Sequence, residues 1–206
     1  MKKYLPLMVN VYNKNVIIFG GGKVALRKAK KLLGLGAKVY VASNRFTKEF
    51  NQIDVKKVPL KGKYKIKELL NGKVLAIAAT NDKEFNLKVK EQSKKLGIMC
   101  NVVDFHGSDV IFPAVFKKGD VVIAVSSSGN LPYFSEFLAY KIGQTIKPYL
   151  EAYPALKKVR QKLKGVNSNK KKKVQKELLN KDLELLRSGK WELIEEKVNR
   201  LLKDVL

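Results

Sequence analysis

Six consecutive residues have the spacing of a phosphate-binding turn, G-x-G-x-x-A; they are Gly20, Gly21, Gly22, Lys23, Val24 and Ala25. The apolar residues 15–19 come directly before this run and predict a buried strand, and residues 23–33 predict a helix with one apolar face. At such a turn glycine lets the backbone approach a pyrophosphate, and the helix N-terminus offers N–H groups to the anion. The pattern therefore favours a dinucleotide site over a purely structural turn.

The residues that would meet the ribose depart from the usual dinucleotide fingerprint. That fingerprint has an acid after the second strand, whereas the strand predicted over residues 38–42 is followed by Ser43, Asn44 and Arg45, with no acid before Glu49. Asn44 is able to bind the ribose hydroxyls, and Arg45 is able to pair with a 2′-phosphate. These residues alone leave the choice between NAD and NADP open.

Two polar residues, Thr80 and Asn81, follow the most apolar run of the chain, residues 74–79. At the end of a strand they would line the second wall of a dinucleotide crevice. At the start of a helix they would instead cap its first turn. Both interpretations carry equal weight on the sequence.

A candidate base, Asp104, follows the apolar run 98–103. We expect it at the carboxyl end of a central strand, where doubly wound sheets bind ligands, and the alternative role is capping or pairing with nearby lysines. His106 is placed to share proton transfer, although a lone histidine in a loop is more often merely solvated. The polar loop 126–128 either binds an anion or a metal-bearing ligand, or is simply flexible.

The elements that must position these residues alternate between strand and helix. Strands are predicted over residues 15–19, 38–42, 55–60, 74–79 and 98–103, with helices over 23–33 and from near 82 to 96. This alternation implies right-handed crossovers and an open parallel sheet. After Pro113 the pattern changes to a hairpin of residues 114–116 and 121–126, and it is helical from Tyr133 onward.

Near the end of the chain, apolar residues that include Trp191, Ile194 and Val198 form a stripe at helical spacing. Such a stripe is more typical of a core or a subunit contact than of a cofactor site. The lysine run 170–173 lacks interleaved aromatics, which favours a solvated loop or helix start over a nucleic-acid contact.

The composition excludes several classes of protein. The 206 residues include 43 Lys and Arg against 18 Asp and Glu, a net charge of +25, yet 45% are hydrophobic, which suits a globular core. A single cysteine, Cys100, and a single histidine, His106, exclude a disulfide framework and a His/Cys zinc site, so no metal site is predicted. The apolar runs are too short to cross a bilayer, and we predict a cytoplasmic protein.

The positive charge first suggests nucleic acid as a partner. However, 38 of the basic residues are Lys and only 5 are Arg, whereas readout of base edges relies on the guanidinium group. The charge is also spread along the chain instead of forming one basic arm. Nucleic acid is therefore not expected, and steering of a multiply anionic small substrate is an alternative explanation.

Five short motifs, in this order and spacing, resemble one family. They are residues 5–7 (LPL), 20–28 (GGGxVAxRK), 78–82 (AATND), 101–104 (NVVD) and 111–114 (IFPA). Together they strongly resemble the precorrin-2 dehydrogenase family, which includes the amino-terminal module of siroheme synthase. The resemblance covers roughly residues 3–150, and the remainder matches only as a lysine-rich helical tail.

The resemblance implies NAD-dependent oxidation of the polycarboxylate precorrin-2 to sirohydrochlorin, with insertion of Fe²⁺ into the product in some members. It also implies a homodimer that forms through the region after the sheet. Carried over by position, the NAD contacts include Lys23, Val24, Asn44 and Arg45, the catalytic base is Asp104, and Ser127 belongs to the tetrapyrrole-side loop.

We therefore expect an α/β fold in three parts. A Rossmann-type parallel sheet that binds NAD takes residues 1–113, a dimerisation region of hairpin and helix takes 114–150, and a helical C-terminal region takes 151–206. Residues 105–107 and 128–132 depart from the family pattern, which leaves Fe²⁺ insertion open. A regulatory protein that binds NAD without catalysis and a lysine-rich nucleic-acid-binding protein are the alternatives.

Overall fold

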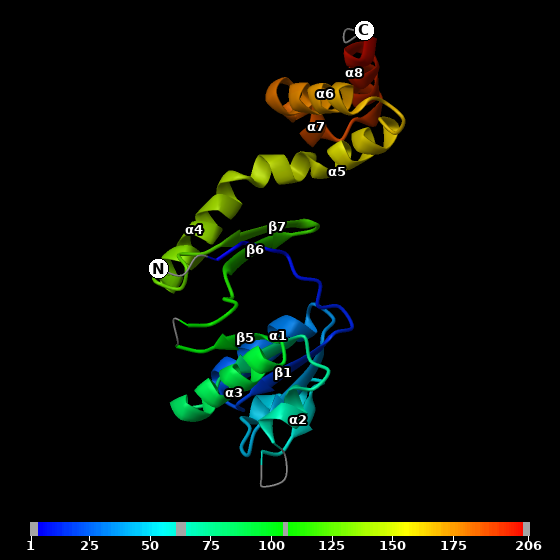
Figure 1. Cartoon of the computed structure of the whole chain (residues 1–206). Helices are drawn as coiled ribbons and strands as arrows, with labels where there is room; N and C mark the ends of the chain where they lie inside the picture. Colours follow the sequence, from blue (N-terminus) through cyan, green and yellow to red (C-terminus); the bar gives the residue numbers. More distant parts are fainter. Residues whose placement is uncertain (1–3, 61–64, 105–106, 204–206) are drawn as a thin grey trace. The chain divides into compact units, whose positions relative to one another are not determined.

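The computed structural model describes residues 4–60, 65–104 and 107–203, and it divides into two compact units, Met1–Phe112 and Pro113–Leu206. The first unit holds a five-stranded parallel sheet in the order β3-β2-β1-β4-β5 (Figure 1). Its strands are β1 (Asn15–Phe19), β2 (Lys38–Ala42), β3 (Lys56–Val58), β4 (Leu75–Ala78) and β5 (Met99–Val102).

Helices cover both faces of this sheet, which explains why its central strands are continuously apolar. One face packs against α1 (Lys23–Leu33) and Phe50 of the 3₁₀ helix η1 (Lys48–Gln52). The other face packs against α2 (Ile66–Leu70) and α3 (Lys83–Lys95), with Leu70 and Val89 fully buried. Residues 16–19 of β1 and all of β4 are buried, as expected for strands enclosed on both sides.

The predicted α/β fold with a parallel sheet is confirmed, but the sequence placed two strands inaccurately. The strand expected over residues 55–60 has only the three residues of β3, and it lies at one edge of the sheet. The strand that precedes Asp104, β5, lies at the other edge, so the expectation of a central strand there is wrong. The short elements η1 and α2 were not predicted.

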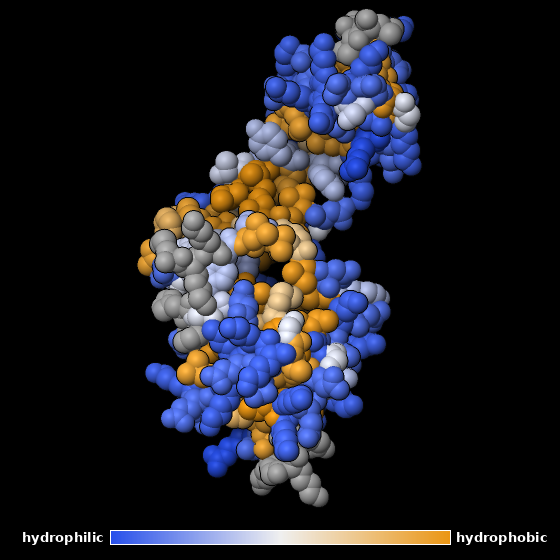
Figure 2. Space-filling view, in the orientation of Figure 1, coloured by the Kyte–Doolittle hydropathy of each residue, from blue (hydrophilic) through white to orange (hydrophobic). Residues whose placement is uncertain are grey.

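The second unit begins with an antiparallel hairpin, as the sequence predicts. Its strands are β6 (Ala114–Lys118) and β7 (Val121–Val125), followed by α4 (Pro132–Thr145). Helix α4 packs closely on the hairpin at Gly143, where a Cβ atom would lie 2.3 Å from Cδ2 of Phe116. Apolar side chains also remain exposed over α4 (Figure 2). Among them are Phe134, which is 50% exposed, and Phe137, which is 45% exposed.

The rest of the second unit is helical, which confirms the predicted helical C-terminal region. It comprises α5 (Lys147–Lys162), α6 (Ser168–Lys181), α7 (Leu183–Ser188) and α8 (Trp191–Lys203). Ile194 and Val198 are fully buried in a core shared with α5 and α6, so the apolar stripe is core. Pro154 does not interrupt α5, and lysines 170–173 belong to the first turns of α6.

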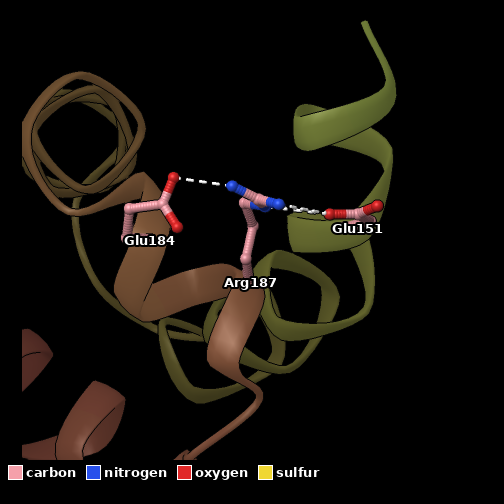
Figure 3. A network of polar contacts seen from close by, with 3 residues as sticks. All are labelled: Glu151, Glu184 and Arg187. Carbon is pink, nitrogen blue, oxygen red and sulfur yellow. Dashed lines mark hydrogen bonds and ion pairs between the residues drawn. The ribbon is translucent and has the colours of Figure 1, made fainter.

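An ion-pair network joins α7 to α5 in this unit. Arg187 contacts Glu151 at 2.9 Å and Glu184 at 2.6 Å (Figure 3). Arg187 and Glu151 are partly exposed and Glu184 is largely exposed, so the network orients the guanidinium group and adds little to stability.

Candidate functional site

Gly20 is the point at which the turn after β1 meets its neighbouring strands. Its φ is +119°, a region that residues with a side chain rarely adopt, and a Cβ atom would lie 2.3 Å from the carbonyl oxygen of Ala79. Its N–H donates to the carbonyl oxygen of Ala42 at 2.9 Å. The turn is therefore wedged between the ends of β2 and β4, and only glycine fits this position.

Gly21, the middle glycine, is equally constrained. A Cβ atom there would lie 2.0 Å from the carbonyl oxygen of Arg45, and the carbonyl oxygen of Gly21 accepts from the N–H of Thr47 at 2.9 Å. The loop after β2 thus docks directly on the glycine turn. The general pattern allows any residue here, so the sequence did not reveal this role.

Gly22 differs from the other two because the space at its side-chain position is open. It has an ordinary extended backbone, φ −86°, and within the described part of the chain no heavy atom beyond Gly22 and its two chain neighbours lies within 4 Å of the position that a Cβ atom would take. It is the N-cap of α1 and supplies no side-chain hydrogen bond to the first turn. The first turn of α1 therefore receives no side-chain cap from Gly22, and the N–H groups of such a turn are able to bind an anion.

The residues that follow the glycines behave as a dinucleotide turn requires. Lys23 and Val24 are exposed at the start of α1, whereas Ala25 is fully buried and lets the helix approach the sheet. Together with the open space at Gly22, they fit a bound pyrophosphate. The turn follows β1, and the strand order reverses between β1 and its neighbour β4. Open α/β sheets bind their ligands at such a point.

The loop after β2 exposes two of the predicted ribose residues. The Ser43 hydroxyl donates to the carbonyl oxygen of Arg45 at 2.6 Å and accepts from its N–H at 3.3 Å. Asn44 and Arg45 are exposed. The pKa of Glu49 in η1 is lowered by a hydrogen bond from its own backbone N–H, and the nearby Lys23 and Lys30 also contribute.

Thr80 and Asn81, which the sequence treated alike, have different environments. The Thr80 hydroxyl donates to Oδ1 of Asn86 at 2.7 Å, and Nδ2 of Asn86 donates to the Thr80 carbonyl at 2.9 Å. Asp82 is the N-cap of α3, with Oδ1 accepting from the N–H of Phe85 at 2.9 Å. Asp82, and neither Thr80 nor Asn81, therefore caps the first turn of α3; Thr80 is engaged with Asn86, and Asn81 is exposed.

Asp104 stands just beyond the carboxyl end of β5. The N–H of Val103 donates to the carbonyl of Ala78 at 3.0 Å, so the ladder between β5 and β4 continues almost to Asp104. Asp104 is exposed and has φ +55°, a left-handed conformation that aspartate tolerates better than most residues. Its carboxylate therefore projects from a turn at the end of the sheet that also carries the glycine turn.

The chain returns to β5 immediately after this turn. The hydroxyl of the buried Ser108 accepts from the N–H of Val102 at 2.8 Å and donates to its carbonyl at 3.0 Å. Ser108 thereby closes the loop that carries Asp104, a role that the sequence did not suggest. His106 lies outside the described residues.

Ser127 lies in the second unit, in the loop before α4. Its hydroxyl accepts from the N–H of Leu131 at 2.8 Å and from the hydroxyl of Ser135 at 3.1 Å. Ser135 is buried, and it also accepts from the N–H of Ser127 at 3.1 Å. These contacts shape the loop before α4, and Ser135 is a residue that the sequence did not identify.

Metal sites and membrane spans are both absent from the described residues. No group of three or more His, Cys, Asp or Glu side chains there is arranged to hold a metal ion. Within the same part of the chain, no helix has the length and apolar character needed to span a membrane.

The chain matches a family model and several curated relatives. A family model described as putative NAD(P)-binding matches residues 7–114. Siroheme synthase 2 of Aeromonas hydrophila is 33% identical over 168 residues, which are 81% of this chain and 36% of that protein. Siroheme synthase of Tolumonas auensis is 32% identical over 174 residues, 82% of this chain and 37% of that protein. The chain thus spans little more than a third of the length of these curated relatives.

Among solved structures, the chain is similar to "SirC, precorrin-2 dehydrogenase". The TM-score is 0.66, with 20% sequence identity and coverage of 98% of each chain. At this identity the similarity establishes a shared fold, which includes the helical region after the sheet.

Proposed function

We propose that this chain, which belongs to the family of putative NAD(P)-binding domains, oxidises precorrin-2 to sirohydrochlorin with NAD. The siroheme synthases that match 81% and 82% of the chain confirm the resemblance predicted from the motifs. The structural observation that carries the proposal is the open space at Gly22, at the point where the strand order reverses. This space suits the pyrophosphate of a dinucleotide.

In this proposal the glycine turn and Asp104 have separate tasks. The N–H groups at the start of α1 hold the pyrophosphate, and the exposed Lys23 adds positive charge beside it. A bound nicotinamide ring supplies the acceptor for a hydride from the tetrapyrrole. Aromatising the macrocycle also releases a proton, which the Asp104 carboxylate accepts as a general base.

The net charge of +25 supports a polycarboxylate substrate. A surface rich in lysine raises the local concentration of an anionic substrate and its rate of association, and salt weakens this attraction. Nucleic acid is not needed to explain the charge. A cytoplasmic location and Fe²⁺ insertion into the product stay predictions from the sequence.

We also propose that the chain forms a homodimer through residues 114–150. Exposed aromatic side chains on α4, including Phe134, Phe137 and Tyr140, suit a buried contact between two copies. Light scattering at micromolar concentration is expected to give the mass of a dimer. A compact monomer under these conditions would contradict this part of the proposal.

The enzymatic proposal is tested by incubating the full chain with precorrin-2 and NAD without oxygen. Sirohydrochlorin and NADH, each followed by its absorbance, are expected to form together in equal amounts. A reaction without cofactor serves as the control. Absence of conversion by folded protein that binds NAD would contradict the dehydrogenase and favour a regulatory NAD-binding protein.

A further inference from the structure

We infer that Ser108 is a positioning residue for Asp104, because its buried hydroxyl closes the loop after β5 and so fixes where the proposed base stands. The inference rests on the proposed function and extends it from the base to the contacts that hold the base in place. It begins from the free edge of β5, the strand that precedes Asp104.

Residues 108–110 return along this edge and take up its hydrogen bonds. The Ser108 hydroxyl accepts from the N–H of Val102 at 2.8 Å and donates to its carbonyl at 3.0 Å. Two residues earlier in β5, the N–H of Cys100 donates to Oδ2 of Asp109 at 3.3 Å, and the Cys100 carbonyl accepts from the N–H of Asp109 at 2.9 Å. Ser108 and Asp109 therefore stand in for a further strand at this edge.

These contacts bracket Asp104. The N–H of Val103, just before it, donates to the carbonyl of Ala78 at 3.0 Å, and Ser108, four residues after it, is bound to Val102. Both ends of the short loop are thus tied to the sheet. The left-handed conformation of Asp104, φ +55°, costs energy in a residue with a side chain and persists only where the surrounding structure holds it. Without the closure by Ser108, we expect the Asp104 backbone to relax and its carboxylate to turn away.

Burial makes the Ser108 hydroxyl difficult to replace. Ser108 is 2% exposed, so removal of its hydroxyl leaves the N–H and carbonyl of Val102 without their partner in a place that water does not reach easily. The Tyr4 hydroxyl donates to the Ser108 carbonyl at 3.1 Å, which ties the segment before β1 to the same point. Ser108 is therefore held through its side chain and through its backbone.

A general base acts only when it is within hydrogen-bond reach of the proton that it removes. A displacement of about 1 Å at a reacting group is able to cost about 10²-fold in rate. Ser108 is thus expected to affect proton removal and to leave dinucleotide binding alone, because the proposed pyrophosphate contacts lie at the glycine turn and the start of α1.

The test compares kcat and KM for precorrin-2 oxidation between the unmodified full chain and Ser108→Ala. We expect kcat to fall by about 10- to 100-fold, with little change in KM or in NAD affinity. Ser108→Thr keeps the hydroxyl and is expected to retain most of the turnover. Tyr4→Phe removes only the outer contact and is expected to lose less kcat than Ser108→Ala. It tests the same loop if Ser108→Ala does not fold.

Ser93→Ala is the matched control, because it also removes a fully buried serine hydroxyl. Ser93 donates to the Val89 carbonyl at 2.8 Å within α3. This variant is expected to lower the unfolding midpoint about as much as Ser108→Ala does and to leave kcat unchanged. An equal loss of kcat in both variants would attribute the effect to instability and would overturn the inference.

A double-mutant cycle with Asp104→Asn separates positioning from other effects of Ser108. Once the Asp104 carboxylate is gone, its position no longer matters, so Ser108→Ala is expected to cost no further kcat in the Asp104→Asn protein. The same loss in both backgrounds would show that Ser108 acts independently of Asp104, against the inference.

The outcomes also separate this inference from the proposed function. If Asp104→Asn loses turnover while Ser108→Ala keeps near-normal kcat, the inference is wrong and the dehydrogenase with its base stands. If Asp104→Asn itself keeps near-normal kcat, the base and the inference both fail, although the dehydrogenase stands. If the folded, unmodified chain binds NAD and converts no precorrin-2, the proposed function fails together with the inference.

Discussion

The ammonium group of Lys28 in α1 lies 4.0 Å from the centroid of the Phe112 ring. Burial, and after it the nearby positive charges of Arg27 and Lys31, lower the pKa of Lys28 from 10.5 to about 8. The partly buried positive charge of Lys28 therefore destabilises the folded state at neutral pH.

This relationship predicts how stability depends on pH. Below about pH 8 Lys28 is charged in both states and its full penalty is present. Between pH 8 and 10.5 the unfolded chain holds more protons at this site, so its contribution to stability rises with pH. Lys28→Met keeps the apolar stem and removes the charge, so it is expected to stabilise the protein at pH 7 by more than at pH 10.

Urea unfolding midpoints at the two pH values measure this difference. Lys30→Met, which removes an exposed charge from the same helix, is the control and is expected to show little change with pH. An equal gain from Lys28→Met at both pH values would show that the charge of Lys28 carries no penalty.

Gly22→Asp is expected to abolish NAD binding without unfolding the protein. The backbone of Gly22 suits any residue, and aspartate is a favoured N-cap, so α1 is expected to be unchanged or more stable. The new carboxylate would accept the N–H groups proposed for the pyrophosphate and would repel it. Calorimetric titration with NAD measures the loss, and Gly22→Ala, which adds only a methyl group, is the matched control. Undiminished affinity in folded Gly22→Asp would refute the assigned site.

Asp104→Asn is expected to slow precorrin-2 oxidation by about 10²- to 10⁴-fold, the usual contribution of a positioned base, with NAD binding retained. Asparagine tolerates the left-handed backbone at φ +55°, so the substitution isolates the loss of the basic oxygen. Turnover measured with sirohydrochlorin absorbance, alongside NAD titration, tests both parts.

His106→Ala is the companion variant and is expected to cost much less. The reverse result, with Asp104→Asn near normal and His106→Ala inactive, would place the base at the histidine. If neither substitution changes turnover, the proton leaves to solvent or to a substrate carboxylate, and the residue-level mechanism is wrong.

Gly143→Ala is expected to destabilise the hairpin and α4 by about 1–3 kcal/mol, the usual effect of overpacking. A methyl group there would lie 2.3 Å from the Phe116 ring, which has to move together with β6. Thermal unfolding followed by circular dichroism measures the change, and Gln144→Ala, at an exposed neighbouring position, is the control. Equal melting temperatures for the two variants would contradict this packing.

The amino-acid sequence by itself determined the fold class and the position of the glycine turn between β1 and α1. Both depend on local patterns, because a strand buried on both faces has a continuous apolar run and a tight turn before a helix needs glycine. Thus β1, α1 and β4 appear within one residue of their predicted ends. The hairpin after Pro113 follows from equally local turn and strand preferences.

Only the tertiary structure decided the roles that depend on distant neighbours. No local pattern reveals that β5 is an edge strand, because strand order is set by pairing between segments far apart in the chain. Gly21 must be glycine because the carbonyl of Arg45, which comes after the whole of α1 and β2, packs on it. Thr80 and Asn81 are both polar and adjacent, so the sequence does not distinguish them. In the structure Thr80 binds Asn86, whereas Asn81 is exposed. Such contacts form only when the sheet brings separate loops to one edge.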